Sequence, residues 1–363
     1  MTRAAEHFSQ NYIEARSRFL AAAERSGARL TQHSCPAAGP KGEALTSDCA
    51  WIGPAQPRRL LVTISGTHGT EGLCGSGVQC AWLEQELWRH LPEDTAALCI
   101  HAINPYGFAW QRRETEENVD LNRNFLDFSQ PLPGNLHYPR LHPLLCLDRW
   151  DEAARGESWK ALERERQTLG PAAFQQALSG GQFTHPNGLF YGGSKPTWAR
   201  RTLEQIFAAL PPSVLHVAVI DYHTGLGPYG YGERILDHRP GSPGYERAAA
   251  WFDGDITSAE AGTSTSAPLV GTNGNGIMAA MPRERSCTWM ALEFGTRTLE
   301  EVFEALRASN WLWREGERNS PQGREVLSYL SYCFAPEDPL WRQQVWERAM
   351  ETQELALRGL ADA

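Results

Sequence analysis

The sequence has no apolar run approaching the roughly 20 residues that a membrane-spanning helix needs. Charges occur throughout residues 1–27, so this stretch lacks the apolar core of a secretory signal, and we expect a cytoplasmic protein. No block of like charges occurs in the 363 residues, and the net charge is -9. This charge distribution argues against nucleic acid and against anionic membranes as partners.

Paired cysteine motifs are also missing. None of the eight cysteines forms a C-x-x-C pair. Isolated cysteines in a long chain without a secretory signal are mostly buried thiols, which favours a reducing compartment. The hydrophobic fraction of 41% and the charged fraction of 21% are typical of a globular protein that can bury a large core. Because no internal repeat or linker is visible, we predict a single domain over residues 1–363.

Short apolar segments alternate with segments of helical spacing, which predicts an α/β fold with a mixed, largely parallel central sheet flanked by helices. The core motifs fall within residues 50–300. A helical insert is expected at about 126–210, and C-terminal helices at about 298–363. The expected strands are residues 60–64, 96–103, 214–220, 235–236 and 288–294, and the other expected helices are 6–25, 75–90, 150–180 and 203–210.

The remaining segments read as connections. A stretch punctuated by Gly and Pro separates the first helix from the first strand. Polar or Gly-rich loops are expected at residues 106–125, 225–232 and 271–276.

Residues that can carry chemistry follow the predicted strands. His68 and Glu71 stand three residues apart in a Gly-rich turn after the first strand, and Asn104 ends the second. His223 and Glu293 belong to the ends of two later strands. Because parallel sheets form their sites at the carboxyl ends of the strands, we expect these side chains to lie close together.

His68, Glu71 and His223 form a candidate zinc site. Zinc is held by histidine nitrogen and carboxylate oxygen, and catalytic sites use three protein ligands. Each residue also has a simpler explanation by itself: His68 as a helix cap, Glu71 as a first-turn acid favoured by the helix dipole, His223 as a hydrogen-bonded loop residue. Their shared position at strand ends favours the metal site.

The glycines at residues 72–77 raise the alternative of a phosphate cradle. Their order is G-x-x-G-x-G rather than G-x-G-x-x-G, and no P-loop lysine follows. We therefore interpret them as positions where a helix approaches the sheet closely.

Four separated blocks carry a family likeness: H-x-x-E at residues 68–71, N-P-Y-G-F at 104–108 with D-L-N-R-N-F at 120–125, His223 after a strand, and L-E-F-G-T at 292–296. In order and approximate spacing they resemble the carboxypeptidase A-like zinc peptidases, a clan that also holds aspartoacylase and succinylglutamate desuccinylase. Residues 65–72 and 221–225 are similar to the S-G-x-H-G-x-E-G and D-x-H-T-G signatures of a less characterised bacterial branch. The resemblance spans roughly residues 50–300.

The resemblance implies one zinc ion per chain, held by His68, Glu71 and His223, with Glu293 as the general base. The chemistry is consistent, since zinc polarises a carbonyl and a neighbouring carboxylate takes a proton from water. A carboxylate inside an apolar strand is costly unless it is paired or functional, which supports a role for Glu293.

The resemblance also implies roles for the loop at residues 106–125. Asn122 and Arg123 would hold a substrate carboxylate, and Asp120 would accept a hydrogen bond from the first zinc histidine. Arg113 would polarise the scissile carbonyl, with Arg112 as the alternative. The other interpretation is a solvated, mixed-charge loop around the two arginines, and a structural role for Arg123.

One departure from the family affects the substrate. Typical carboxypeptidases place a tyrosine shortly before the base, but residues 252–292 contain none. A deacylase acting on N-acyl amino acids therefore fits as well as a carboxypeptidase. Selectivity is expected from residues 126–200 and 225–232, with residues 187–193 as a lid, a pocket wall or an ordinary turn. The tyrosines that could reach the site from elsewhere are Tyr191, Tyr222, Tyr229 and Tyr231.

Taken together, the sequence predicts a zinc-dependent hydrolase that cleaves an amide bond, in a peptide or an acyl-amino acid, next to a substrate carboxylate. Its partner would be a small molecule or short peptide that bears this carboxylate. The alternatives are an N-acyl-amino-acid deacylase and, from another class, a non-catalytic zinc-containing binding protein. Glu293 argues against the last, because a structural zinc site needs no base.

Overall fold

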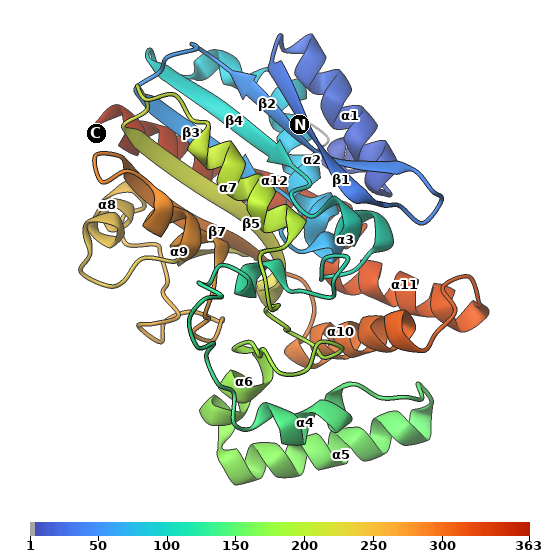
Figure 1. Cartoon of the computed structure of the whole chain (residues 1–363). Helices are drawn as coiled ribbons and strands as arrows, with labels where there is room; N and C mark the ends of the chain where they lie inside the picture. Colours follow the sequence, from blue (N-terminus) through green and yellow to red (C-terminus); the bar gives the residue numbers. More distant parts are fainter. Residues whose placement is uncertain (1–3) are drawn as a thin grey trace.

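A computed structural model of the chain describes residues 4–363. Its centre is one seven-stranded sheet with the strand order β1-β2-β4-β3-β5-β7-β6 (Figure 1). The strands are β1 (Arg29–Ala38), β2 (Ala44–Ile52), β3 (Arg59–Ile64), β4 (Thr95–His101), β5 (His216–Tyr229), β6 (Gly232–Leu236) and β7 (Ser286–Gly295).

The sheet is mixed, with a parallel centre. Strands β4, β3, β5 and β7 run parallel to one another. Antiparallel strands flank them, β2 and β1 on one side and β6 on the other. The predicted fold class, a mixed and largely parallel sheet flanked by helices, is confirmed.

Helices cover both faces of the sheet and extend below its strand ends (Figure 1). The α-helices are α1 (Tyr12–Arg25), α2 (Gly72–Glu84), α3 (Pro105–Trp110), α4 (Tyr138–Leu145), α5 (Glu152–Leu169), α6 (Pro171–Ser179), α7 (Trp198–Ala208), α8 (Pro243–Trp251), α9 (Asn273–Ala280), α10 (Leu299–Arg314), α11 (Pro321–Phe334) and α12 (Pro339–Ala361). The short 3-10 helices are η1 (Ala4–His7), η2 (Gly69–Glu71), η3 (Leu87–His90) and η4 (Leu121–Arg123).

The central strands are buried on both faces because successive side chains point to opposite sides. In β3, Leu60, Val62 and Ile64 join the cluster that α7 and α9 complete. Leu61 packs in the opposite cluster, with residues of α2, α8 and α12. The near-continuous apolar character of residues 60–64 thus reflects two separate cores, one on each face.

Three predicted connections form regular structure instead. The segment before β3 forms the antiparallel pair of β1 and β2, although its Gly and Pro residues favoured a connection without regular structure. Pro36 is tolerated there because β1 is an edge strand whose register is irregular between Ser34 and Ala38. The predicted loop at 225–232 is partly strand, since β5 continues to Tyr229. The Gly/Asn-rich loop at 271–276 contains the start of α9, capped by the Thr272 hydroxyl.

A separate apolar core lies at the carboxyl ends of the strands. Helices α4, α5 and α6 of the predicted insert pack with α10 and α11 around shared apolar residues. Figure 1 shows these helices as a layer apart from the sheet. The insert is thus brought to the end of the sheet where a site was predicted.

Two further observations concern the whole chain. All eight cysteines are free and buried, as expected from their spacing. Within residues 4–363, none of the helices combines the length and the apolar character that crossing a membrane requires. The single domain over residues 1–363 stays a prediction, and residues 1–3 lie outside the described part.

Candidate metal and substrate site

A tightly packed turn delivers the first two predicted ligands. After β3 the chain enters η2 and then α2. Gly66 has a φ of +72°, a left-handed conformation that side chains rarely adopt. At Gly69 an added Cβ would lie 1.8 Å from the carbonyl carbon of Gly107 in α3. The turn therefore lies directly on α3, and it carries His68 and Glu71, both buried.

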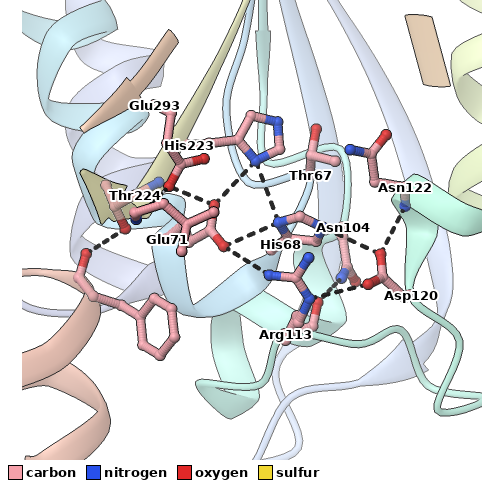
Figure 2. A network of polar contacts seen from close by, with 12 residues as sticks. Thr67, His68, Glu71, Asn104, Arg113, Asp120, Asn122, His223, Thr224 and Glu293 are labelled. Carbon is pink, nitrogen blue, oxygen red and sulfur yellow. Dashed lines mark hydrogen bonds and ion pairs between the residues drawn. The ribbon is translucent and has the colours of Figure 1, made fainter. Parts of the chain in front are cut away.

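The three predicted ligands converge on one point (Figure 2). The Nδ1 atom of His68 lies 2.9 Å from a Glu71 carboxylate oxygen, and that of His223 lies 3.1 Å from the other. The two Nδ1 atoms are 3.2 Å apart. All ligand atoms of the set lie within 4.8 Å of one another, so the cluster could hold a metal ion.

A carboxylate stands behind each histidine. Nε2 of His68 lies 3.2 Å from Asp120 Oδ1, and Nε2 of His223 lies 3.0 Å from Asp221 Oδ2. An ionised carboxylate only accepts, so with a metal ion bound each Nε2 would carry the proton and each Nδ1 would offer its lone pair to the centre. Three acceptors then face each other at the centre, an arrangement that a cation satisfies. The two nitrogens and one carboxylate are a donor set that suits zinc and its neighbours among the divalent metals.

The electrostatics of the cluster agree with this donor set. Burial lowers the pKa of His223, but the Asp221 and Glu71 carboxylates outweigh it and raise that pKa well above its ordinary value. Burial raises the pKa of Glu71, but His68 and His223 outweigh it and lower that pKa. The carboxylates around the two histidines thus make the centre of the cluster favourable for positive charge.

Of the two candidate arginines, only Arg113 faces the cluster. Its Nε donates to Asp120 at 3.0 Å, and its Nη1 lies 3.2 Å from Glu71 (Figure 2). Asn104 caps α3 and donates through Nδ2 to the Arg113 carbonyl at 3.3 Å, so it positions the arginine loop. Arg112 is buried elsewhere, where it contacts Glu114, Asn118 and Trp313.

Asp120 joins these groups because three donors meet on its carboxylate. The Arg113 guanidinium, the Asn122 backbone N–H and the His68 ring all reach it. Burial raises its pKa, but Arg113, Arg123 and His68 lower it well below the ordinary value of 3.8. Asp120 thus remains ionised and holds the His68 ring in place.

Asn122 and Arg123 lie together at the edge of the cluster. Arg123 donates to two backbone carbonyls, its Nη1 to Asn122 at 2.9 Å and its Nη2 to Ser179 at 2.7 Å. Its Nε is buried without a partner in the described chain. Burial lowers its pKa to about 10, so it remains charged near neutrality. A buried cation with an unused donor can accept an anionic group of a ligand.

Glu293 lies beside His223, its register partner on the adjacent strand. Its Oε1 accepts the Leu226 backbone N–H at 2.9 Å, and part of its surface stays accessible. Burial, together with the charge of Glu71, raises the pKa of Glu293 to about 7. Glu293 lies inside β7, within the strand expected at 288–294. His223 lies inside β5, which continues to Tyr229, rather than after a strand that ends at residue 220, and this corrects its expected placement.

One cavity of about 580 Å³ opens onto these groups. It brings together most of the predicted site residues, while Asp120 stands behind His68. Within residues 4–363 no tyrosine lines the cavity, including the four that were considered. The predicted site residues in its wall are His68, Glu71, Arg113, Asn122, Arg123, His223 and Glu293.

Three residues of the site were not predicted individually. Asp221 had a signal, because it precedes His223 by two positions in a strand and therefore shares its face. Phe190 lies in the segment 187–193 and lines the cavity, with its ring 5.4 Å from the Arg113 guanidinium carbon, which supports the pocket-wall interpretation. Asp237, just after β6, also lines the cavity, and burial raises its pKa to about 6. No sequence pattern pointed to it.

The fold and the cluster define an α/β protein with a buried His-Glu-His site at the end of its sheet. Residues 8–348 match the family described as "Protein of unknown function (DUF2817)", and the chain belongs to this family. No match was found among curated proteins.

Solved structures similar to the chain include three from bacteria. An aspartoacylase family protein from Mesorhizobium loti is 13% identical, with 78% of this chain and 66% of that one covered and a TM-score of 0.38. Murein-tripeptide amidase MpaA from Escherichia coli O157 is 17% identical, with 80% and 93% covered and a TM-score of 0.35. Succinylglutamate desuccinylase from Chromobacterium violaceum is 14% identical, with 84% and 75% covered and a TM-score of 0.35.

Aspartoacylase and succinylglutamate desuccinylase are also the families named from the sequence motifs. The TM-scores lie below 0.5, so these likenesses carry no weight for the substrate or the mechanism.

Proposed function

We propose that this protein is a zinc-dependent hydrolase that cleaves an amide bond next to a substrate carboxylate, in a peptide or an acyl-amino acid. The observation that carries the proposal is the convergence of His68 Nδ1, His223 Nδ1 and the Glu71 carboxylate, with Glu293 beside them in the same cavity. A structural metal site would not need a further carboxylate with a raised pKa, so this pairing supports catalysis over a purely structural or sensing site.

The metal-binding residues and the general base would have separate roles. His68, Glu71 and His223 would hold the zinc ion, which when bound polarises a carbonyl and lowers the pKa of water. Glu293 would take the proton from the attacking water and return it to the leaving nitrogen. With a pKa near 7, its carboxylate exchanges a proton readily near neutrality.

The arginines would handle the negative charges. Arg113 points at the cluster and would stabilise the charge that develops on the carbonyl oxygen. Arg123 with Asn122 would bind the substrate carboxylate, since the Arg123 Nε is buried and unpartnered within the described chain.

The second candidate is an N-acyl-amino-acid deacylase rather than a carboxypeptidase. It is favoured because the described chain supplies no tyrosine to the cavity wall. A hydrolysis screen with C-terminal dipeptides in one panel and N-acyl amino acids in another separates the two activities. Silence in both panels would favour the non-catalytic zinc-containing binding protein.

The Glu293→Gln variant tests the mechanism. We expect about one zinc ion per chain by elemental analysis, unchanged in Glu293→Gln and lost in His68→Ala. Turnover of Glu293→Gln should fall about 10²- to 10⁴-fold, the contribution typical of a general base. Glu325→Gln, at an exposed position of α11, is the matched control. Wild-type turnover in Glu293→Gln would refute this residue as the base, and retained metal in His68→Ala would refute the ligand set.

A further inference from the structure

The cavity has two chemically different ends. Most of its ionisable groups gather where the strands end, around His68, Arg123 and Glu293. Three more, Glu163, Arg166 and Glu300, line the cavity from α5 and α10. The opposite wall consists of helices α5, α6 and α10, which belong to the core that the insert shares with the C-terminal helices. A ligand held at the polar end therefore meets a wall of different composition at the other.

Each of these helices turns one stripe toward the cavity. On α10 the apolar lining residues are Leu299, Val302, Phe303 and Leu306, which are spaced by three, one and three residues, and Glu300 lines the cavity beside Leu299. Residues at this spacing share one face of a helix. The helix is continuous there, so four apolar side chains stand in a row along the cavity.

The insert helices repeat the same spacing. On α6 the stripe includes Phe174 and Leu178, and on α5 it includes Trp159 and Leu162. Trp159, Phe174 and Leu178 are only partly buried, and Leu299 is 56% exposed. Large apolar side chains that stay accessible inside a concave cavity are typical of a ligand-binding wall.

The apolar wall is attached to the predicted carboxylate clamp. Ser179, the last residue of α6, accepts a hydrogen bond from Arg123 Nη2 at 2.7 Å. The Phe190 ring lies 5.9 Å from the Arg123 guanidinium carbon and packs in the same apolar cluster as α6 and α10. A molecule bound by Arg123 thus begins next to the apolar wall.

We infer that the substrate carries a large apolar group, an aliphatic chain or an aromatic ring, which packs against the stripes of α5, α6 and α10. This inference rests on the proposed function, because the apolar group belongs to the molecule whose amide bond is cleaved. A cavity of about 580 Å³ is in the range that holds a drug-sized ligand. A small acetylated amino acid would leave much of the apolar wall in contact with water.

Two substrate series test the inference and locate the apolar group. One lengthens the acyl chain of N-acyl-glycine from acetyl to hexanoyl to decanoyl. The other keeps the acetyl group and changes glycine to leucine and phenylalanine. We expect kcat/KM to rise about two- to fourfold per added methylene in one series, since burying a methylene stabilises the complex by an amount of that order. The series that responds shows which side of the amide carries the group.

Binding provides a readout that does not depend on turnover. Calorimetry with Glu293→Gln compares N-acetyl-glycine with N-decanoyl-glycine. Tighter binding of the decanoyl compound without any hydrolysis by the wild type would support the apolar subsite and refute the hydrolase. Hydrolysis with flat kcat/KM in both series would overturn the subsite and leave the hydrolase standing. No binding and no hydrolysis of either compound would overturn both.

Substitutions on α6 test whether its lining residues cause the preference for the longer acyl chain. Leu178→Glu places a charge on the lining face, and we expect the ratio of decanoyl to acetyl kcat/KM to fall at least tenfold. Gln176→Glu adds the same charge at an exposed position of the same helix that does not line the cavity, and the ratio should not change. Phe174→Ala is the milder companion, expected to lower the ratio several-fold if Leu178→Glu fails to fold. An unchanged ratio in Phe174→Ala and in folded Leu178→Glu would refute the assignment to α6.

Discussion

Each histidine of the cluster is held between the shared centre and a carboxylate of its own. Asp120 serves His68 and Asp221 serves His223, and neither carboxylate stands alone. Asp120 accepts from Arg113, while Asp221 accepts from Thr67 and, at 2.7 Å, from Asn273. These outer hydrogen bonds hold the two carboxylates in place beside the rings, and the inner nitrogens of both rings point to one centre.

Asp221→Asn tests this arrangement. The variant keeps an acceptor but removes the charge behind His223, so we expect the dissociation constant for zinc to rise about 10- to 100-fold. Competition with a chelator of known affinity measures this. Asp237→Asn is the comparison variant, because Asp237 is a half-buried carboxylate of the same cavity whose charge also reaches His223 but which does not stand behind its Nε2. Equal affinities of Asp221→Asn and wild type would show that the carboxylate does not tune the site.

Arg123→Ala tests the predicted clamp. For substrates with a free carboxylate, kcat/KM should fall about 10- to 100-fold, the loss expected for a charged hydrogen bond. The methyl ester of the same substrate should be affected much less. Because Arg123 also holds the end of α6 through Ser179, a melting curve must accompany the kinetics. Equal losses for acid and ester would assign Arg123 a structural role instead.

At the scale of secondary-structure elements, unequal strand lengths create the site. β3 stops at Ile64, paired with Asp221, while β5 and β7 continue side by side through His223 and Glu293. Beyond the end of β3, the chain that follows it turns back over this extended pair as η2 and α2. This arrangement places His68 and Glu71, from the turn after β3, opposite His223 of β5.

The close contact of α2 with the sheet is needed for this geometry. At Gly75 an added Cβ would lie 2.7 Å from Ser65 Cβ and 2.9 Å from Tyr222 Cβ. This supports the interpretation that the glycines of residues 72–77 let a helix approach the sheet.

Gly75→Ala should therefore destabilise the fold. We expect a loss of about 1–3 kcal/mol, typical of overpacking, seen as a lower midpoint in thermal or denaturant unfolding. Gly156→Ala in α5 is the matched control, because nothing lies within 4 Å of an added Cβ there and alanine favours a helix. A Gly75→Ala variant as stable as Gly156→Ala would mean that α2 can shift without cost.

At the scale of the whole molecule, three histidines outside the cluster have lowered pKa values, and His101 is fully buried. The His101 ring in β4 stacks on Phe19, and its Nε2 forms a hydrogen bond of 2.9 Å with the Ser76 hydroxyl. Its Nδ1 has no hydrogen-bond partner in the described chain. Burial, with a smaller effect of Arg16, lowers its pKa to about 3. Burial also lowers the pKa values of His142 and His238 to about 4.

The sign of the resulting pH dependence follows from these shifts. Between pH 6.5 and about 3, the unfolded chain binds a proton at His101 that the folded chain does not, so the free energy of unfolding falls as pH falls. The expected slope from this residue is about 1.4 kcal/mol per pH unit. His101→Gln should flatten the slope by about that amount when urea unfolding is measured from pH 7 to pH 4. An unchanged slope would show that His101 is protonated in the folded state.

Much of the site was predictable because its residues lie in or next to segments with a clear apolar pattern. His68 and Glu71 follow residues 60–64, of which four are apolar, and His223 and Glu293 lie in or directly after similar segments. Short apolar segments bounded by turn residues favour central strands, since a strand buried on both faces of a parallel sheet is apolar along its length. Parallel alignment of those strands then brings their carboxyl ends to one edge of the sheet.

Other features could not be inferred from local pattern. β1 and β2 carry little apolar periodicity and are recognisable only through their pairing. Arg112 and Arg113 are adjacent and chemically identical, and only the fold of the loop around Asn104 decides that Arg113 faces the cluster. Asp237 reaches the cavity only because β6 pairs with β7.

The sequence by itself therefore determined the fold class and the residues that meet at the strand ends. The pattern of apolar residues is a local property of the sequence, and the same pattern determines which segments become buried strands in the fold. Only the tertiary structure decided which arginine faces the site, that no tyrosine of the described chain lines the cavity, and that insert helices α5 and α6 line it with apolar side chains. These outcomes depend on contacts between segments far apart in the chain, whose geometry no single stretch of sequence encodes.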